Sequence, residues 1–287
     1  MDTGFHEGER AVQERAGTRA DAERLGGMLD APDLTAGVGR FLAERTFAAI
    51  SARDADGRLW TSPLSGAPGF LRAVDATTLA VNATPPAGDP LHALPAGQPL
   101  GMLAIEFARR RRVRVNGTLT DVTKDGLTVA VEQAYGNCPR FIHPRDLAPS
   151  APASSGDVRR GPALTTADQD LVTGSDTFLL GTTHPTRGND ASHRGGPAGF
   201  VHVTDPRTLW WPDYPGNNMF NSFGNLAVDP EAALLFLDFT TGATLHLSGT
   251  AVVDWSAAGD LDTGRRVEFH VEAVASGSTI PLRAGPS

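Results

Sequence analysis

Cysteine is almost absent from this sequence, which contains only Cys138. An intramolecular disulfide is therefore excluded, and nothing indicates an oxidising compartment. Aromatic residues make up only 7% of the chain, whereas glycine and proline occur 32 and 21 times. This composition favours a turn-rich β protein over a helix bundle.

Long apolar runs and an excess of positive charge are lacking as well. No stretch approaches the roughly 18 consecutive apolar residues of a transmembrane helix, and the polar start MDTGFHEGER does not resemble a signal peptide. The formal charge of −8 argues against nucleic acid or an anionic membrane as a partner. The eight histidines show no metal-ligand spacing, so we expect no metal site. These absences predict a soluble, cytoplasmic protein.

An internal repeat is the strongest signal in the 287 residues. The segment GAPGFLRAVDATTLAV, from Gly66, aligns with GPAGFVHVTDPRTLWW, from Gly196. TFAAISARDADG pairs with TFLLGTTHPTRG upstream, and LAIEFARRRRVRVNGTL pairs with LLFLDFTTGATLHLSGT downstream. Matches in one order with nearly constant spacing predict two copies of one fold.

The linker predicts where the copies divide. APSAPASSGDVRRGPA is rich in proline, alanine and serine, which is typical of a connection between domains. We expect an N-terminal helical extension over residues 1–30, a first barrel over 31–147, a linker over 148–163 and a second barrel over 164–287. The extension is expected to pack on the outside of a barrel.

Hydrophobic periodicity predicts the elements of each copy. Leu34, Val38, Phe41 and Leu42 recur at helical spacing, and Thr165 with Asp168 matches a capping box before the second helix. Alternation then predicts strands, with turns such as Lys124-Asp125-Gly126 suited to hairpins. A mainly β fold with short helices, in which an antiparallel meander closes into a barrel, accounts for each copy.

The second copy resembles a known family. ASHRGGPAGFVHV, TLWWPDYPGNNMFNSFGNLAVDPEAALLFLDF and TLHLSGTAVV are similar to the FMN-binding split barrel of the pyridoxamine 5'-phosphate oxidase-like superfamily. With EQAYGNCPRFI in the first copy, the whole chain resembles the two-barrel, predicted flavin-nucleotide-binding branch. The resemblance implies two tandem split β-barrels, an internal pseudo-dimer that binds FMN between barrels.

The resemblance also implies which residues bind the cofactor. One barrel of that family supplies an arginine-bearing strand and a phosphate loop, and the other supplies its closing strand. The loop of this chain has no arginine or lysine, unlike the family pattern, and the arginines of the first copy are the candidate replacement. The predicted cofactor-binding residues are Ser192, His193, Arg194, Pro212, Asp213, Tyr214, Asn217, Asn218, Arg111, Arg112, Arg114, Asn137, Cys138 and Arg140.

The two copies have diverged in a complementary way. The first copy has an arginine-rich closing strand but a proline-rich stretch, residues 83–99, in place of the loop. The second copy has the loop, and its closing strand lacks arginine. We expect one composite site per chain and an empty reciprocal site. Without the resemblance, the arginine run would indicate a solvated sheet face.

The implied function is an FMN-dependent oxidoreductase that takes a hydride from a reductant such as NAD(P)H, because the flavin carries the redox chemistry. No catalytic proton carrier is evident. A non-catalytic flavin module, the same fold with a deazaflavin or haem, and a tandem barrel that has lost both sites stay open as alternatives. The substrate is unassigned, and an exposed barrel face favours a homodimer.

Overall fold

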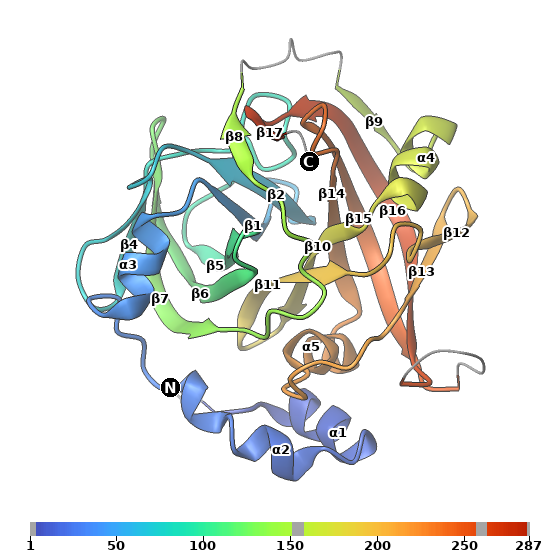
Figure 1. Cartoon of the computed structure of the whole chain (residues 1–287), viewed down its shortest axis with the longest axis horizontal. Helices are drawn as coiled ribbons and strands as arrows, with labels where there is room; N and C mark the ends of the chain where they lie inside the picture. Colours follow the sequence, from blue (N-terminus) through green and yellow to red (C-terminus); the bar gives the residue numbers. More distant parts are fainter. Residues whose placement is uncertain (1–3, 151–157, 257–262, 286–287) are drawn as a thin grey trace.

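Two antiparallel sheets with the same strand order form the body of the molecule in the computed structural model (Figure 1). The structure describes residues 4–150, 158–256 and 263–285. The first sheet has the order β2-β1-β5-β6-β7-β4-β3 and the second the order β11-β10-β14-β15-β16-β13-β12. Position by position these orders correspond, so the internal repeat is a repeat of topology.

The first sheet is built from seven strands. They are β1 (Phe47–Arg53), β2 (Leu59–Ser65), β3 (Leu71–Ala73), β4 (Thr78–Val81), β5 (Gln98–Glu106), β6 (Arg111–Val122) and β7 (Leu127–Gly136). Helix α3 (Gly37–Ala43) precedes them and buries Phe41 and Leu42. Residues 82–97, between β4 and β5, contain turns but no helix, which agrees with the proline-rich stretch read from the sequence.

The second sheet has the equivalent seven strands and one additional helix. The strands are β10 (Thr177–His184), β11 (Gly188–Gly195), β12 (His202–Asp205), β13 (Thr208–Pro212), β14 (Glu231–Leu237), β15 (Ala243–Asp254) and β16 (Arg266–Thr279). Helix α4 (Thr166–Gly174) begins at the predicted capping box, in which Thr165 and Asp168 bond reciprocally. Helix α5 (Asn221–Val228) fills the position between β13 and β14.

Strands with two apolar faces join the barrels. On β1, Ala48 and Ile50 face the core of the first barrel, while Phe47 and Ala49 belong to a third cluster between the barrels. On β14, Phe236 packs inside the second barrel and Leu235 packs between the two. Because side chains alternate along a strand, these continuous apolar runs bury both faces.

Short elements at the ends complete the fold. Strands β8 (Leu147–Pro149) and β17 (Leu282–Ala284) pair with each other, and β9 (Arg159–Gly161) pairs with β16. The two ends of the predicted linker are therefore short strands, and residues 151–157 within it lie outside the described part of the chain. No helix in the described ranges has the length and apolar character that crossing a membrane requires.

The N-terminal extension forms α1 (Glu7–Arg15), α2 (Arg19–Glu23) and a 3-10 turn, η1 (Gly26–Leu29). In Figure 1, α1 lies directly beside α5. Phe5, Leu29 and Ala22 pack against Tyr135 of the first barrel and Met219 of the second. The extension thus contacts both copies and is more than a helix on the outside of one barrel.

Candidate functional site

A cavity of about 100 Å³ lies where the two barrels meet. Strand β6 of the first barrel and strand β11 of the second supply arginines to it. The loop after β13 and the segment after β7 complete the walls. We call this space the arginine cavity. Of the residues predicted from the sequence, it is lined by Arg112, Arg114, Asn137, Cys138, Arg140, His193, Arg194, Pro212, Asp213, Tyr214 and Asn217.

The start of β6 explains which arginines reach the cavity. Arg109 and Arg110 belong to the turn before the strand, and Arg110 has a left-handed backbone with φ of 53°. From Arg111 onward the chain is extended, so Arg112 and Arg114 project from the same face. Strand alternation therefore selects two arginines from the run.

One of these arginines is already paired inside the protein. The Nη1 atom of Arg114 donates to Oδ2 of Asp190 at 2.9 Å, and both side chains are buried. Burial alone would lower the pKa of Arg114, but the Asp190 carboxylate raises it above its ordinary value. This pair crosses between the barrels, because Arg114 is on β6 and Asp190 is on β11.

In the part of the chain that the structure describes, Arg112 and Arg194 contact a carbonyl and an aromatic ring and not a carboxylate. Arg112 donates from Nη1 to the His193 carbonyl at 3.3 Å, while Arg194 lies over the Phe223 ring, 5.2 Å from its centroid. Burial, with the charges of Arg114 and Arg194, lowers the pKa of Arg112 to about 9. The cavity therefore concentrates positive charge that an anion would relieve.

Several buried polar atoms of the cavity have no hydrogen-bond partner among the described residues. They include Nε of Arg112, of Arg114 and of Arg194, together with both ring nitrogens of His193. Burial, then Arg112 and Arg194, lowers the pKa of His193 well below its ordinary value, so the imidazole is neutral near pH 7. Buried polar atoms without partners are rare in folded proteins and indicate a place for a polar ligand.

Contacts across the mouth of the cavity hold the two barrels together. Asn217 donates from Nδ2 to Oδ1 of Asn137 at 2.9 Å. The rings of Phe141 and Tyr214 stack with centroids 4.8 Å apart. The half-buried Cys138 lies in the same segment, and its backbone N–H donates to Asn137 Oδ1 at 2.8 Å.

Comparison with known proteins assigns the second copy to a family. The family model of pyridoxamine 5'-phosphate oxidase matches residues 164–281, which contain β11, the loop after β13 and β15. Residues 164–281 are therefore similar to this oxidase family. No curated protein matches the chain.

Solved structures of the same split-barrel type align over about two-fifths of this chain. A candidate pyridoxamine 5'-phosphate oxidase from Lactobacillus delbrueckii is 18% identical, with 39% of this chain and 93% of that chain covered and a TM-score of 0.33. HupZ from Group A Streptococcus is 14% identical, with coverages of 41% and 98% and a TM-score of 0.33. A FAD-binding protein from Mesorhizobium loti is 12% identical, with coverages of 42% and 97% and a TM-score of 0.29.

Three predicted residues of the oxidase-like site lie outside the arginine cavity. Ser192 is fully buried and donates to the Leu180 carbonyl. Arg111 is exposed and lies over the Phe41 ring, because alternation turns it away from Arg112. Asn218 lines an adjoining cavity of about 70 Å³. The structure thus gathers eleven of the fourteen predicted residues around one space.

The reciprocal position, where the proline-rich stretch of the first copy meets the closing strand β15 of the second copy, is built differently. His246, which the repeat aligns with Arg114, is fully buried, and its Nδ1 donates to the Thr61 carbonyl at 2.9 Å. Asp89, from the proline-rich stretch, lies 3.6 Å from His246 and accepts a hydrogen bond from Ser62 at 2.6 Å. A carboxylate of the chain itself therefore occupies the neighbourhood of the strand that would bind an anion.

Residues that support the loop after β13, which is the predicted phosphate loop, carried no signal in the sequence. Gln13 of α1 is fully buried and donates to the Met219 carbonyl at 3.0 Å. Arg265 pairs with Asp213 at 2.9 Å. These contacts join segments that are far apart in the chain, and no spacing or local pattern could have revealed them.

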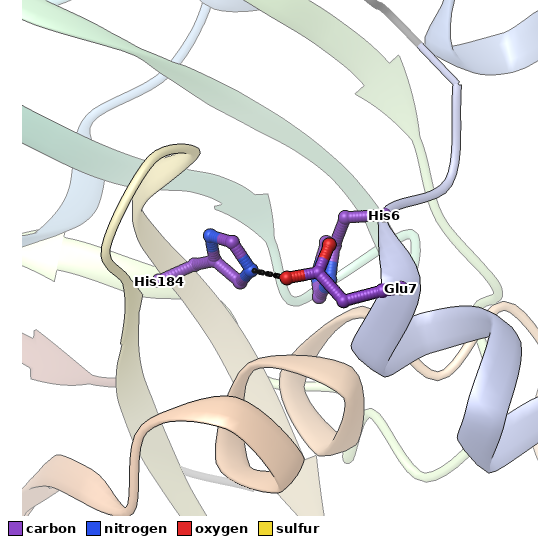
Figure 2. A group of neighbouring side chains, drawn as sticks. All are labelled: His6, Glu7 and His184. Atoms are coloured by element: carbon purple, nitrogen blue, oxygen red, sulfur yellow. Dashed lines mark hydrogen bonds and ion pairs between the residues drawn. The ribbon is translucent and has the colours of Figure 1, made fainter.

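A group of potential metal ligands lies outside the arginine cavity. His6, Glu7 and His184 place ligand atoms within 4.8 Å of one another (Figure 2). Nδ1 of His6 accepts from the Gly8 N–H, and Nδ1 of His184 accepts from backbone N–H groups at 3.2 Å. Each Nε2 therefore carries the proton, and that of His184 points to Glu7 at 3.3 Å. The group is a hydrogen-bonded network that joins α1 to β10.

Proposed function

We propose that the chain binds FMN with its phosphate in the arginine cavity. The observation that supports this proposal is the meeting of Arg112, Arg114 and Arg194 from two barrels, each with a buried and unpartnered Nε. Guanidinium groups recognise phosphate through paired, charge-assisted hydrogen bonds. The loop after β13 contributes no cation, and the first barrel supplies the charge that this loop lacks.

The size of the cavity defines which part of the cofactor it fits. A volume of about 100 Å³ suits a phosphate group and falls short of a whole flavin nucleotide. The stack of Phe141 on Tyr214 closes the same space, and Phe141 has a left-handed backbone with φ of 61°. We propose that this segment moves outward when the flavin ring binds.

The proposed activity is an oxidoreductase. Bound FMN would supply hydride transfer between a reductant such as NAD(P)H and a small acceptor. The chain would contribute binding, orientation and electrostatics. Arg112 and Arg194 would neutralise the phosphate, and the neutral His193 would offer one hydrogen-bond donor and one acceptor to the ligand.

A titration with FMN tests the binding proposal. The visible absorption of the purified protein and quenching of flavin fluorescence report bound cofactor. We expect the double variant Arg112→Gln, Arg194→Gln to lose at least about a hundredfold in affinity, because two charge-assisted contacts contribute about 1.5 kcal/mol or more each. The matched control is Arg109→Gln with Arg111→Gln, which removes the same charge from exposed positions. Flavin binding that survives in the first double variant would contradict the proposal.

Catalysis needs a separate measurement. Rapid mixing of the FMN-loaded protein with NADPH or NADH gives the rate of flavin reduction. A rate well above that of free FMN supports the oxidoreductase, whereas an equal rate supports a non-catalytic flavin module. A spectrum with deazaflavin or haem bands would assign another cofactor to the same fold.

A further inference from the structure

A second and larger cavity, of about 280 Å³, lies on the other side of the Arg114–Asp190 pair. Asp190 lines this space, and Arg114 lines the arginine cavity. Its walls come from α1, α5, β11 and the strands β6 and β7. We call it the acidic cavity. No cofactor-binding residue predicted from the sequence belongs to it.

Four of the five amide side chains that line the acidic cavity, all but Gln133, already donate hydrogen bonds within the protein. Asn189 donates to the Pro99 carbonyl at 2.9 Å, and Asn225 donates to Thr182 at 2.9 Å. Asn221 donates to Oε1 of Glu9. Arg187, a further donor in the wall, bonds the Gly4 carbonyl at 2.9 Å. Few donors are therefore left for a ligand.

Acceptors, by contrast, remain. Asn116 is only 9% exposed and uses its Nδ2 on Asp190 at 3.3 Å, while its Oδ1 has no partner among the described residues. The carboxyl groups of Glu9, Asp190 and Glu132 line the same space. Glu132 is exposed at the rim, and the other two are buried. A carboxylate has about four acceptor positions, so these groups can accept further bonds.

From this excess of acceptors we propose that the acidic cavity binds a small aliphatic ammonium compound. An ammonium group offers three donors and no acceptor, which complements the wall. A volume of about 280 Å³ corresponds to roughly nine water molecules, so the ligand is about the size of a short diamine. This site is independent of the flavin proposal, because it requires none of the arginines.

The charge of Glu9 adds a pH dependence to this binding. Burial raises the pKa of Glu9 to about 7, while hydrogen bonds from His6 and Asn221 act in the opposite direction. Asp190 raises this pKa further and Arg187 lowers it. His6 itself is neutral, because burial lowers its pKa to about 4. A cation therefore binds most tightly above pH 7, where Glu9 is ionised.

Calorimetric titration of the full chain with putrescine tests the proposal. Butanediol and succinate are probes of similar length that replace the ammonium groups with neutral hydroxyls or carboxylates. We expect saturation near one putrescine per chain at about pH 8, affinity about tenfold lower at about pH 6, and no heat from the other two probes. Glu9→Gln should bind putrescine about tenfold more weakly at the higher pH and lose the pH dependence.

Glu132→Gln provides a second test in case the variant at the buried position, Glu9→Gln, does not fold. This rim residue accepts a hydrogen bond from the Thr118 hydroxyl, and loss of its charge should weaken putrescine binding about threefold. Glu272→Gln is the matched control, since Glu272 is exposed and pairs with Arg58 away from the cavity. Equal binding of butanediol, absence of putrescine binding, or unchanged affinity in both cavity variants would each overturn the proposal.

Discussion

Arg112 shows how a single residue can favour ligand binding at the expense of stability. Its guanidinium is held near two other arginines, and its pKa is lowered to about 9 by burial and by those charges. A buried cation without a carboxylate partner costs free energy in the unliganded protein. An anion bound beside it would recover that cost, so we expect ligand affinity and stability to be coupled at this residue.

We therefore expect Arg112→Met to stabilise the flavin-free protein. The change keeps most of the side-chain volume and removes the charge, so the free energy of unfolding should rise by about 1 kcal/mol. Urea denaturation with and without FMN measures this free energy of unfolding. Wild type should gain stability with FMN, whereas the variant should gain little. Arg111→Met is the control at an exposed position. If Arg112→Met is less stable than wild type and still gains stability with FMN, Arg112 has a structural role.

At the scale of elements, the docking of α1 onto α5 organises the acidic cavity and the phosphate loop. Gly8 and Gly224 let the helices touch, because a Cβ on Gly8 would lie 2.2 Å from the Gly224 carbonyl oxygen. The buried polar side chains His6, Glu9 and Gln13 make the contacts. Glu9 accepts a hydrogen bond from Asn221, and Gln13 donates one to the Met219 carbonyl, next to the loop after β13.

His6 and Glu9 make this docking respond to pH in opposite directions. The folded pKa of Glu9, about 7, lies above its ordinary 4.5, so its contribution to stability is lost as pH rises from about 4.5 to 7. The folded pKa of His6, about 4, lies below its ordinary 6.5, so stability is lost as pH falls from about 6.5 to 4. Between about pH 4.5 and 6.5 the two effects cancel.

Single substitutions should separate the pH dependence of stability that comes from Glu9 from that which comes from His6. In Glu9→Gln, the free energy of unfolding should fall by about 3 kcal/mol as pH decreases from about 6.5 to 4. In His6→Asn, which can still cap α1, it should rise by about 3 kcal/mol as pH decreases from about 7 to 4.5. Urea denaturation over a pH series measures both slopes. Parallel slopes in the two variants would contradict this account.

The sequence predicted these elements unevenly, for physical reasons. Periodicity and the Thr165–Asp168 capping box predicted α3 and α4, since both signals are local. The sequence predicted that the N-terminal extension packs on a barrel but did not predict that it contacts both copies, because buried polar side chains such as Gln13 look like surface residues until their partners are known.

For the whole molecule, the meeting of Arg112 with His193 and Arg194 depended on how two copies pack. The repeat and the family resemblance together were enough to anticipate that meeting. They were not enough to separate Arg111 from Arg112 or to anticipate the stack of Phe141 on Tyr214, since Phe141 has a left-handed backbone. The first copy supplies β6, and the second supplies β11 and the loop after β13, so the arginine cavity forms where the two copies meet.

The different contributions of the two copies also predict how many flavins bind per chain. The reciprocal position has a buried Asp89 near His246, and a carboxylate there repels phosphate. FMN titration should saturate at about one flavin per chain, whether the chain is a monomer or a dimer. Asp89→Asn leaves the stoichiometry at one, because the position still lacks arginine. Saturation at two flavins per chain would show that both copies kept a site and that their divergence has another cause.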